Sequence, residues 1–331
     1  MNFASGSVHA ITNCNTDRLP GGRRWMQNRG LRALSPILIT LALLEGQPVS
    51  RLDQRVRAAI GGFSATTSLF AKNLDTGETY GLRENERVRT ASTIKLAIMA
   101  AVFDAVAHDK AKWTEELVLH DSDKVNGTGI IRELDDGTRL AVRGLVNVMI
   151  VVSDNTATNL LLDRFTADAV NAEMDALGLK QTRVMRKILI SGKDPSGFSQ
   201  AGRLEENHRF GLGSTTPREM VTLIEKMERG ELVSKTASRE MLEILKRQQY
   251  KDGIGRRTGN VPVASKSGSL DRLRSDVGIV YSPGGRIAIA ITCDDLPKVD
   301  YSADNAGNIF ISELTGILID GLAKKSERGT P

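Results

Sequence analysis

The segment Ser92-Thr-Ile-Lys95 places a hydroxyl and an amine three residues apart, where an apolar helical pattern begins. Residues three apart share a helix face, so the Lys95 amine can reach the Ser92 hydroxyl. A lysine whose pKa is lowered by burial or by a neighbouring cation can take up the hydroxyl proton and make the serine a nucleophile. The alternative is a serine N-cap followed by a solvated lysine. This is the only Ser-x-x-Lys in the chain, and it predicts nucleophilic catalysis.

Two polar triplets supply groups that could complete such a site. Ser153-Asp-Asn155 offers a hydroxyl able to relay a proton to a leaving nitrogen, and an amide that both donates and accepts hydrogen bonds. In Lys266-Ser-Gly268 the lysine and the serine hydroxyl can bind a carboxylate, and the glycine lets a substrate approach a strand backbone closely. Taken singly, the first triplet could be a helix N-cap and the second an exposed strand end.

The order and spacing of the three motifs are more specific than any one of them. Ser-Asp-Asn follows Ser-x-x-Lys by 61 residues, and Lys-Ser-Gly follows after a further 113. This set occurs in class A β-lactamases and penicillin-binding proteins. The chain therefore resembles the class A serine β-lactamase family of the β-lactamase and penicillin-binding-protein superfamily. The resemblance covers roughly residues 52–322, with Ser267 where threonine is usual.

The resemblance implies roles for the residues of the motifs. Ser92 would be the acylated nucleophile, Lys95 its base, directly or through water, and Ser153 the group that passes a proton to the lactam nitrogen. The residues implied to hold the substrate are Asn155, Lys266, Ser267, Gly268, Ser269 and Arg274. Among these, the backbone N–H of Ser269 would form the oxyanion hole with that of Ser92. Arg274 would be a supplementary anchor for the substrate carboxylate.

One departure from the family pattern concerns release of the acyl group. In class A enzymes a loop glutamate activates the hydrolytic water, in an Arg-x-Glu stretch shortly after a Thr-Arg step. Thr182-Arg183 and Arg186 are present, but the position two after Arg186 is Ile188. Glu205 has the Arg-x-Glu spacing about 17 residues later, so we expect Glu205, or alternatively Glu206, to be the catalytic carboxylate. If neither reaches the site, the protein would acylate and stall, as a penicillin-binding protein does.

Hydrophobic periodicity and turn residues predict the elements that position these groups. Helices are predicted over 50–63, 93–106, 143–152, 156–165, 167–177, 217–229, 238–248 and 305–322, and strands over 68–72, 79–82, 261–265, 277–281 and 286–293. Residues 188–213 show no period. We therefore predict an α/β (α+β) fold, in which an antiparallel five-stranded sheet is covered by the terminal helices. A second, all-helical lobe would complete it, with the site in the cleft between the lobes.

The first 48 residues differ from the rest and resemble a leader. A basic segment with Arg23, Arg24, Arg29 and Arg32 precedes the 12-residue apolar run 33–44, which is too short to span a bilayer and is typical of a secretory signal. A buried amphipathic helix or an uncleaved anchor are the alternatives. We predict an exported bacterial protein, periplasmic or secreted, with a leader over 1–48 and a β-lactamase-type catalytic domain over 49–325. Its sheet lobe would comprise about 49–90 and 250–325, and its helical lobe about 91–249.

Composition argues against nucleic-acid and metal partners. The 331-residue chain has a formal charge of +5, but residues 1–44 hold five Arg and one Asp, and the other 287 residues hold 40 basic and 39 acidic side chains. Aromatic residues make up 4%, too few for a nucleic-acid surface. Cys14 and Cys293 allow no disulfide framework once the leader is removed, and the four His lack ligand spacing. We expect a buried Cys293, no metal and no cofactor.

Three functions remain open from the sequence. The first is a serine β-lactamase (EC 3.5.2.6) that confers antibiotic resistance by opening β-lactam rings through an acyl-enzyme on Ser92. The second is a D,D-peptidase-like or penicillin-recognising serine hydrolase with slow deacylation. The third is a non-catalytic binding or sensor domain that uses the same pocket. In each case we expect a monomer whose partner is a small β-lactam or related acyl compound, with no membrane contact beyond a possible leader anchor.

Overall fold

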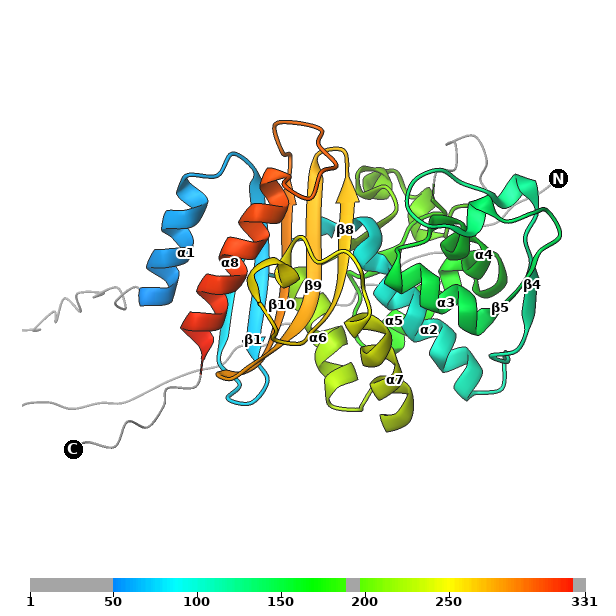
Figure 1. The fold of residues 1–331 in the computed structure, drawn as a ribbon, viewed down its shortest axis with the longest axis horizontal. Coiled ribbons are helices and arrows are strands. Elements are labelled where there is room, and N and C mark those ends of the chain that lie inside the picture. The colour runs from blue at the N-terminus through cyan, green and yellow to red at the C-terminus, as the bar shows by residue number, and fades with distance from the viewer. Residues whose placement is uncertain (1–49, 189–196, 324–331) are drawn as a thin grey trace, which may run out of the picture. The chain divides into compact units, whose positions relative to one another are not determined.

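A central antiparallel sheet organises the computed structural model, which describes residues 50–188 and 197–323 (Figure 1). The predicted leader lies outside the described residues. The strand order is β2-β1-β10-β9-β8. These strands are β1 (Thr66–Asn73), β2 (Thr79–Leu82), β8 (Val263–Leu270), β9 (Leu273–Ser282) and β10 (Gly285–Asp294). The N-terminal hairpin thus joins the three C-terminal strands through the β1–β10 pair, and the prediction of a five-stranded antiparallel sheet is confirmed.

Each face of this sheet is apolar because side chains alternate between the two faces of a strand. In β10, Ile287, Ile289 and Ile291 belong to one buried cluster, whereas Ala288 and Ala290 belong to the other. The first cluster includes residues of the terminal helices α1 (Arg51–Gly61) and α8 (Ala306–Leu322). Figure 1 shows these two helices together on one face of the sheet, as the sequence predicts. Cys293 also lies in this cluster, fully buried as expected.

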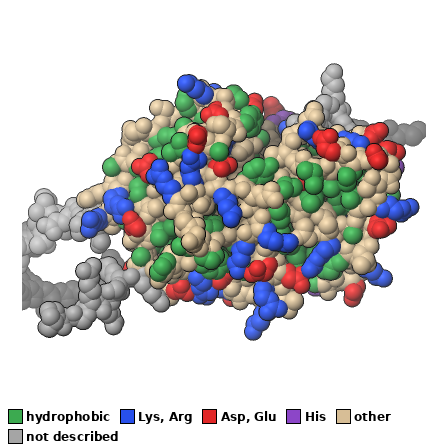
Figure 2. Space-filling view, viewed as in Figure 1, with side chains coloured by type: hydrophobic (Ala, Val, Ile, Leu, Met, Phe, Trp, Pro, Cys, Tyr) green, Lys and Arg blue, Asp and Glu red, His purple; other side chains and the backbone are tan. Residues whose placement is uncertain are grey.

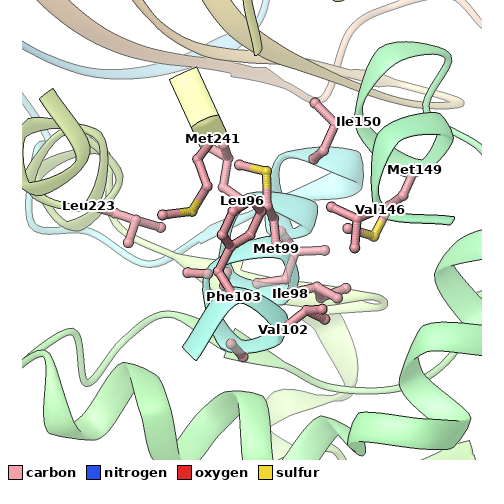
Figure 3. Close-up of a cluster of buried hydrophobic side chains, with 14 of the residues drawn as sticks. Leu96, Ile98, Met99, Val102, Phe103, Val146, Met149, Ile150, Leu223 and Met241 are labelled. Carbon is pink, nitrogen blue, oxygen red and sulfur yellow. The ribbon is translucent and has the colours of Figure 1, made fainter. Parts of the chain in front are cut away.

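The second cluster forms around one central helix. The helices of this part are α2 (Lys95–Ala107), α3 (Val142–Val151), α4 (Asn155–Phe165), α5 (Ala167–Ala176), α6 (Pro217–Glu228) and α7 (Lys235–Lys246). Every residue of α2 from Lys95 to Phe103 is buried, as is typical of a helix that is apolar on all sides. Figure 3 shows Leu223 of α6 and Met241 of α7 on one side of α2, and Val146 of α3 on another.

The predicted all-helical lobe also contributes strands to two small sheets that periodicity did not predict, one of which includes a strand from residues just before that lobe. The first is built from β3 (Val88–Arg89), β7 (Gly213–Thr215) and β6 (Arg183–Val184), and the second from β4 (Glu116–Val118) and β5 (Arg139–Ala141). Strands of two or three residues are too short to show an alternating pattern, which explains why the sequence does not reveal them.

The surface of the described part mixes both signs of charge. Figure 2 shows Lys and Arg side chains interspersed with Asp and Glu side chains over the visible face. This distribution agrees with the near-neutral charge of the chain beyond the first 44 residues. Within the described ranges, no helix combines the length and the apolar character needed to cross a membrane.

We predict that Leu223→Ala lowers the free energy of unfolding by about 2–5 kcal/mol, because Leu223 is fully buried in the second cluster and its truncation leaves a cavity. Chemical denaturation would measure the change. Leu204→Ala is the matched control, since Leu204 is 50% exposed and its truncation should cost less than about 0.5 kcal/mol. Equal losses for the two variants would contradict the packing described above.

Candidate active site

Ser92 lies in a tight turn held in a strained conformation. The 3-10 turn η1 (Ala91–Ile94) contains Ser92, and α2 begins only at Lys95, so the serine precedes the helix instead of opening it. The preceding residue, Ala91, is buried and has a φ of 48°. A non-glycine residue in the left-handed region costs of order 1–3 kcal/mol and persists only where the surrounding structure enforces it. The backbone at Ser92 is therefore fixed by its surroundings.

Hydrogen bonds from the Lys95 amine connect the Ser-x-x-Lys motif to the Ser-Asp-Asn motif. Its side chain is fully buried, and its Nζ lies 2.7 Å from the Ser153 carbonyl oxygen, 3.2 Å from Ser153 Oγ and 3.0 Å from Asn155 Oδ1. Burial, followed by the positive charge of Lys266, holds the pKa of Lys95 well below its ordinary value, although Asp154 acts in the opposite direction. Such an amine gives up its proton readily and can act as a base.

The Ser153-Asp-Asn turn is organised by its middle residue. Asp154 is the N-cap of α4 and accepts from the Ala157 N–H, and its second oxygen accepts from the N–H groups of Ile130 and Ile131. The cap is thus Asp154, which leaves the Ser153 hydroxyl free for Lys95. Ser153 itself has a φ of 54°, a second left-handed residue at the site.

Thr128 belongs to this arrangement although no sequence motif indicates it. Its hydroxyl donates to the Ser153 carbonyl at 2.7 Å. The neighbouring loop is held by Asn155, whose Nδ2 donates to the Asn126 carbonyl. The loop over 126–131 is therefore fixed to the start of α4 by side chains of the Ser-Asp-Asn turn.

The Lys-Ser-Gly motif lies within β8, because this strand extends to Leu270, beyond the predicted end at 265. Lys266 is fully buried, and its Nζ donates to the Ser267 carbonyl at 2.8 Å and to Gln248 Oε1 at 3.3 Å. Burial lowers the pKa of Lys266 to about 7. This lysine is therefore poised between its charged and neutral forms near neutral pH.

Gly268 is the point at which β8 meets the nucleophile turn. A Cβ added at Gly268 would lie 2.8 Å from the Thr90 carbonyl oxygen and 3.0 Å from the Ser92 nitrogen. Real Cβ atoms do not approach backbone atoms this closely, so only glycine fits. The close contact fixes the Ser92 N–H beside the β8 backbone.

A pocket of about 220 Å³ opens where these elements meet. The residues that line it are Ser92, Thr128, Ser153, Tyr250, Asp252, Gly253, Ser267, Gly268, Ser269, Arg274, Ser275, Asp276, Tyr301, Ser302 and Asn308. All three sequence motifs contribute to this set or bond to a member of it. The structure thus brings together Ser92, Lys95, Ser153, Asn155 and the Lys266–Ser269 segment, as the sequence predicts.

Arg274 lines the pocket, yet backbone groups already occupy most of its donors. Its side chain is 2% exposed, and its guanidinium donates to the carbonyls of Leu270 and Leu273, each at 2.6 Å, and to that of Asp300. The Tyr301 ring lies 5.1 Å from its Cζ. Since three of its five N–H groups are engaged, Arg274 fastens the β8–β9 hairpin to the 300–301 segment and has little left for a substrate carboxylate.

The structure does not bring Glu205 or Glu206 to the pocket. Both side chains are exposed in the turn η6 (Glu205–Phe210), and neither lines the pocket. This turn is anchored elsewhere, because Asn207 Oδ1 accepts from Arg87 Nη2 at 2.9 Å. The Arg-x-Glu spacing of this segment therefore reflects an exposed acidic turn.

Position 188 lies close to the site through a clamp on its backbone. The Ile188 N–H donates to Asn159 Oδ1 at 2.8 Å, and Asn159 Nδ2 donates to the Ile188 carbonyl at 3.1 Å. Asn159 follows Asn155 by four residues in α4, which is about one turn or 5–6 Å along the helix. The segment thus passes one turn from the Lys95–Asn155 contact and carries an apolar side chain there. Residues 189–196 lie outside the described residues.

Two aspartates on the pocket wall have no counterpart in the sequence prediction. Asp276 is 1% exposed and Asp252 is partly exposed. An aspartate directly before the apolar residues 277–280 of β9 was the available signal for the first of them. In the part of the chain that the structure describes, no cluster of His, Cys, Asp or Glu could hold a metal ion.

Known proteins match both the sequence and this arrangement. The sequence model of a family described as the Beta-lactamase enzyme family matches residues 51–322. Beta-lactamase L2 of Stenotrophomonas maltophilia is 28% identical over 246 residues, 72% of this chain and 69% of that protein. Among solved structures, a β-lactamase from Sphaerobacter thermophilus has a TM-score of 0.70 and 29% identity, over 82% of this chain and 96% of the other. The structure of PBP-A has a TM-score of 0.70 at 23% identity, over 83% and 96% of the two chains.

The matched region contains the whole sheet, the helices that cover it and all three motifs. The chain belongs to the β-lactamase enzyme family. The resemblance to serine β-lactamases that the motifs indicate is therefore confirmed, as is the mixed fold with its five-stranded antiparallel sheet.

We predict that Gly268→Ala slows labelling of Ser92 by a fluorophosphonate about tenfold or more, because the new Cβ must displace the nucleophile turn and misaligned reacting groups lose rate steeply. Gly144→Ala is the control, since a Cβ at this exposed position of α3 meets nothing within 4 Å. Unchanged labelling of the Gly268 variant would show that β8 does not constrain Ser92.

Proposed function

We propose that this protein is a serine hydrolase that opens β-lactam rings through an acyl-enzyme on Ser92 and releases the acyl group slowly. The observation that carries the proposal is the buried Lys95 amine, bonded to the Ser153 hydroxyl beside the pocket that Ser92 lines. Membership of the β-lactamase enzyme family supports the substrate class.

The acylation step follows from these contacts. Lys95, as a neutral amine, takes the Ser92 proton directly or through water, and Ser92 Oγ bonds to the lactam carbonyl carbon. The negative charge on the carbonyl oxygen is stabilised by the N–H groups of Ser92 and Ser269. The carbon–nitrogen bond then breaks, and the nitrogen takes a proton from the Ser153 hydroxyl, which regains one from Lys95. The opened ring keeps its amine, so no fragment leaves.

The proposed binding groups come from β8 and β9 and from the start of α4. Lys266 and Ser267 would hold the substrate carboxylate, with Arg274 contributing through its remaining donors. Asn155 would hold the amide of the substrate side chain, since its Oδ1 and Nδ2 already bridge Lys95 and the 126–131 loop.

For deacylation, the described residues provide fewer candidate catalytic groups than they do for acylation. A water must be activated near Ser92, and a carboxylate is the group that family members use for it. Position 188 carries isoleucine, and Glu205 and Glu206 are exposed outside the pocket. The residues for acylation are thus present, whereas none of these three positions supplies a base for hydrolysis, and the acyl-enzyme should accumulate.

Other features of the protein are proposed from the same resemblance. We assign it to the class A type of serine β-lactamase, with a catalytic domain over 49–325 and a leader over 1–48. Export to the periplasm or the medium and a monomeric state follow as proposals, as does catalysis without a cofactor. β-Lactam resistance would then depend on how fast the acyl-enzyme turns over.

A second candidate is a D,D-peptidase-like hydrolase that acts on peptide or ester substrates. The apolar side chain at position 188 favours it, because an enzyme that transfers its acyl group to an amine needs no dedicated hydrolytic water. The two candidates share Ser92, Lys95 and Ser153 and differ in how the acyl group leaves.

We predict that benzylpenicillin adds its full mass to Ser92 and that this adduct persists for minutes or longer, because the ring opens without loss of a fragment and none of the positions 188, 205 and 206 supplies a carboxylate for deacylation. Intact-mass spectrometry with peptide mapping would measure it. Ser92→Ala should show no adduct. A wild-type protein that hydrolyses many equivalents without a detectable adduct would refute the slow-release proposal, and one that never forms the adduct would refute acylation by β-lactams.

We predict that Ile188→Glu shortens the lifetime of this adduct by about tenfold or more, because it adds a water-activating carboxylate to a backbone held one helical turn from the Lys95–Asn155 contact. Leu204→Glu is the control, since it adds the same charge at an exposed position further along the chain. If both variants keep the wild-type lifetime, the missing carboxylate at position 188 is not the cause of slow release.

A further inference from the structure

A second pocket, of about 350 Å³, shares no lining residue with the active-site pocket. It opens where the paired ends of β1 and β10 meet β3 and the end of η6. Three arginines line it: Arg87, Arg89 and Arg209. The proposed acylation uses none of these groups, so the arrangement of charge in this pocket needs a separate explanation.

Two of the three arginines have no acidic partner. Arg89 Nε donates to Asp294 Oδ2 at 2.9 Å, and the two side chains form an ion pair. Among the described residues, neither Arg87 nor Arg209 forms an ion pair with a carboxylate. Arg87 Nη2 donates only to two neutral side-chain oxygens, at 2.9 and 3.0 Å, and its buried Nε has no acceptor. Both guanidiniums therefore keep donors and charge that the described residues do not use.

The buried Phe210 ring holds these two cations close together. Arg87 Cζ lies 4.2 Å from the ring centroid, and Arg209 Cζ lies 4.5 Å from it. A cation over an aromatic face is attracted to the ring, but this attraction does not remove the repulsion between the cations. Burial, followed by the charge of Arg209, lowers the pKa of Arg87, and the opposing effect of Glu206 is smaller. An anion that contacts both guanidiniums would relieve this repulsion.

Hydroxyl groups of the sheet line the same pocket. Ser68 of β1 lies directly opposite Thr292 of β10, so their side chains share one face of the sheet. Ser68 is 3% exposed, and its hydroxyl forms no hydrogen bond among the described residues. A buried hydroxyl without a partner costs free energy. An oxygen acceptor in the pocket would satisfy it.

The acidic side chains of the pocket leave the two arginines uncompensated. Asp294 is engaged by Arg89. Glu86 and Asp295 are exposed, and neither forms an ion pair among the described residues. Water and salt screen such exposed charges, whereas Arg87 is partly buried. The charge that lacks a partner beside the Phe210 ring is therefore positive.

We propose that this pocket binds a small oxyanion with at least two negative charges, either a phosphate group or a dicarboxylate, through Arg87, Arg209 and the Ser68 hydroxyl. Guanidinium groups suit such ligands because their paired N–H donors match two oxygens of one anion. Ser68 belongs to β1 and Arg209 to η6, so a bound anion connects segments that are far apart in the sequence. The site does not depend on the proposed function.

The first test titrates the full chain with inorganic pyrophosphate and, separately, with malonate, by calorimetry and by thermal unfolding. The buffer should have low ionic strength and contain no other oxyanion. We expect saturable binding that raises the unfolding temperature and weakens as sodium chloride is added. Tighter binding of pyrophosphate would indicate a phosphate ligand, and tighter binding of malonate a dicarboxylate. No binding of either anion would overturn the proposal.

Arg209→Gln is the most direct variant. Arg209 is exposed, and its side chain forms no hydrogen bond or ion pair among the described residues, so the fold should tolerate the change. We expect the affinity for the anion to fall about tenfold or more, because a charged donor is lost. Arg257→Gln is the matched control, since Arg257 is exposed and lines neither pocket. Equal affinities of Arg209→Gln and wild type would contradict the proposed site.

A second measurement locates the anion, because the active-site pocket is also expected to bind an anionic group. Nitrogen-15 NMR of the arginine side chains reports the Nε–H of Arg87, with Arg87→Lys to assign the signal. We expect pyrophosphate to shift this signal equally in wild type and in Ser92→Ala, and much less in Arg209→Gln. If calorimetry detects binding while the Arg87 signal stays in place, the anion lies elsewhere and the proposal is wrong, whether or not penicillin acylates Ser92.

Discussion

The burial of the Lys95 amine is the constraint on which the rest of the site depends. Removing an ammonium from water costs free energy. Three oxygen atoms accept hydrogen bonds from the Lys95 amine, and its lowered pKa favours the neutral form, so both reduce this cost. Two of these acceptors come from a serine with a φ of 54°, and the third comes from the first residue of α4. The fully apolar surroundings of α2 thus provide the low-dielectric setting in which a lysine becomes a base.

Steric fit supplies the second requirement, which is a fixed position for the Ser92 backbone. Ala91, just before the serine, has a left-handed backbone, and Gly268 allows β8 to approach the backbone from Thr90 to the Ser92 nitrogen. Neither feature would be stable alone, because a left-handed alanine relaxes unless its neighbours prevent it. The two large clusters on either side of the sheet provide that rigidity, which is why a glycine in a strand and an alanine in a turn can together orient an N–H group.

Much of the fold and of the site could be predicted from the sequence because the deciding signals are local. The helical and alternating patterns predict the main elements, and the three motifs name the residues around Lys95. Other features depend on tertiary contacts and could not be predicted. One is the environment of Arg274, because carbonyls from the hairpin and from Asp300 engage three of its five N–H groups. Glu205 matched a spacing, whereas the clamp on Ile188 involves Asn159, 29 residues earlier in the chain.

The proposed mechanism requires opposite protonation states of two buried lysines: a neutral Lys95 as the base and a charged Lys266 as the anion-binding group. Both are fully buried, and burial favours the neutral amine in each case. A neutral amine can act as a base, as Lys95 must, but it binds a carboxylate weakly, which is the role proposed for Lys266. Burial alone therefore cannot account for both roles. Each lysine has one carboxylate that opposes this shift, Asp154 for Lys95 and Asp276 for Lys266, but only Lys95 is pushed further toward neutrality by a second lysine, because the charge of Lys266 acts on it.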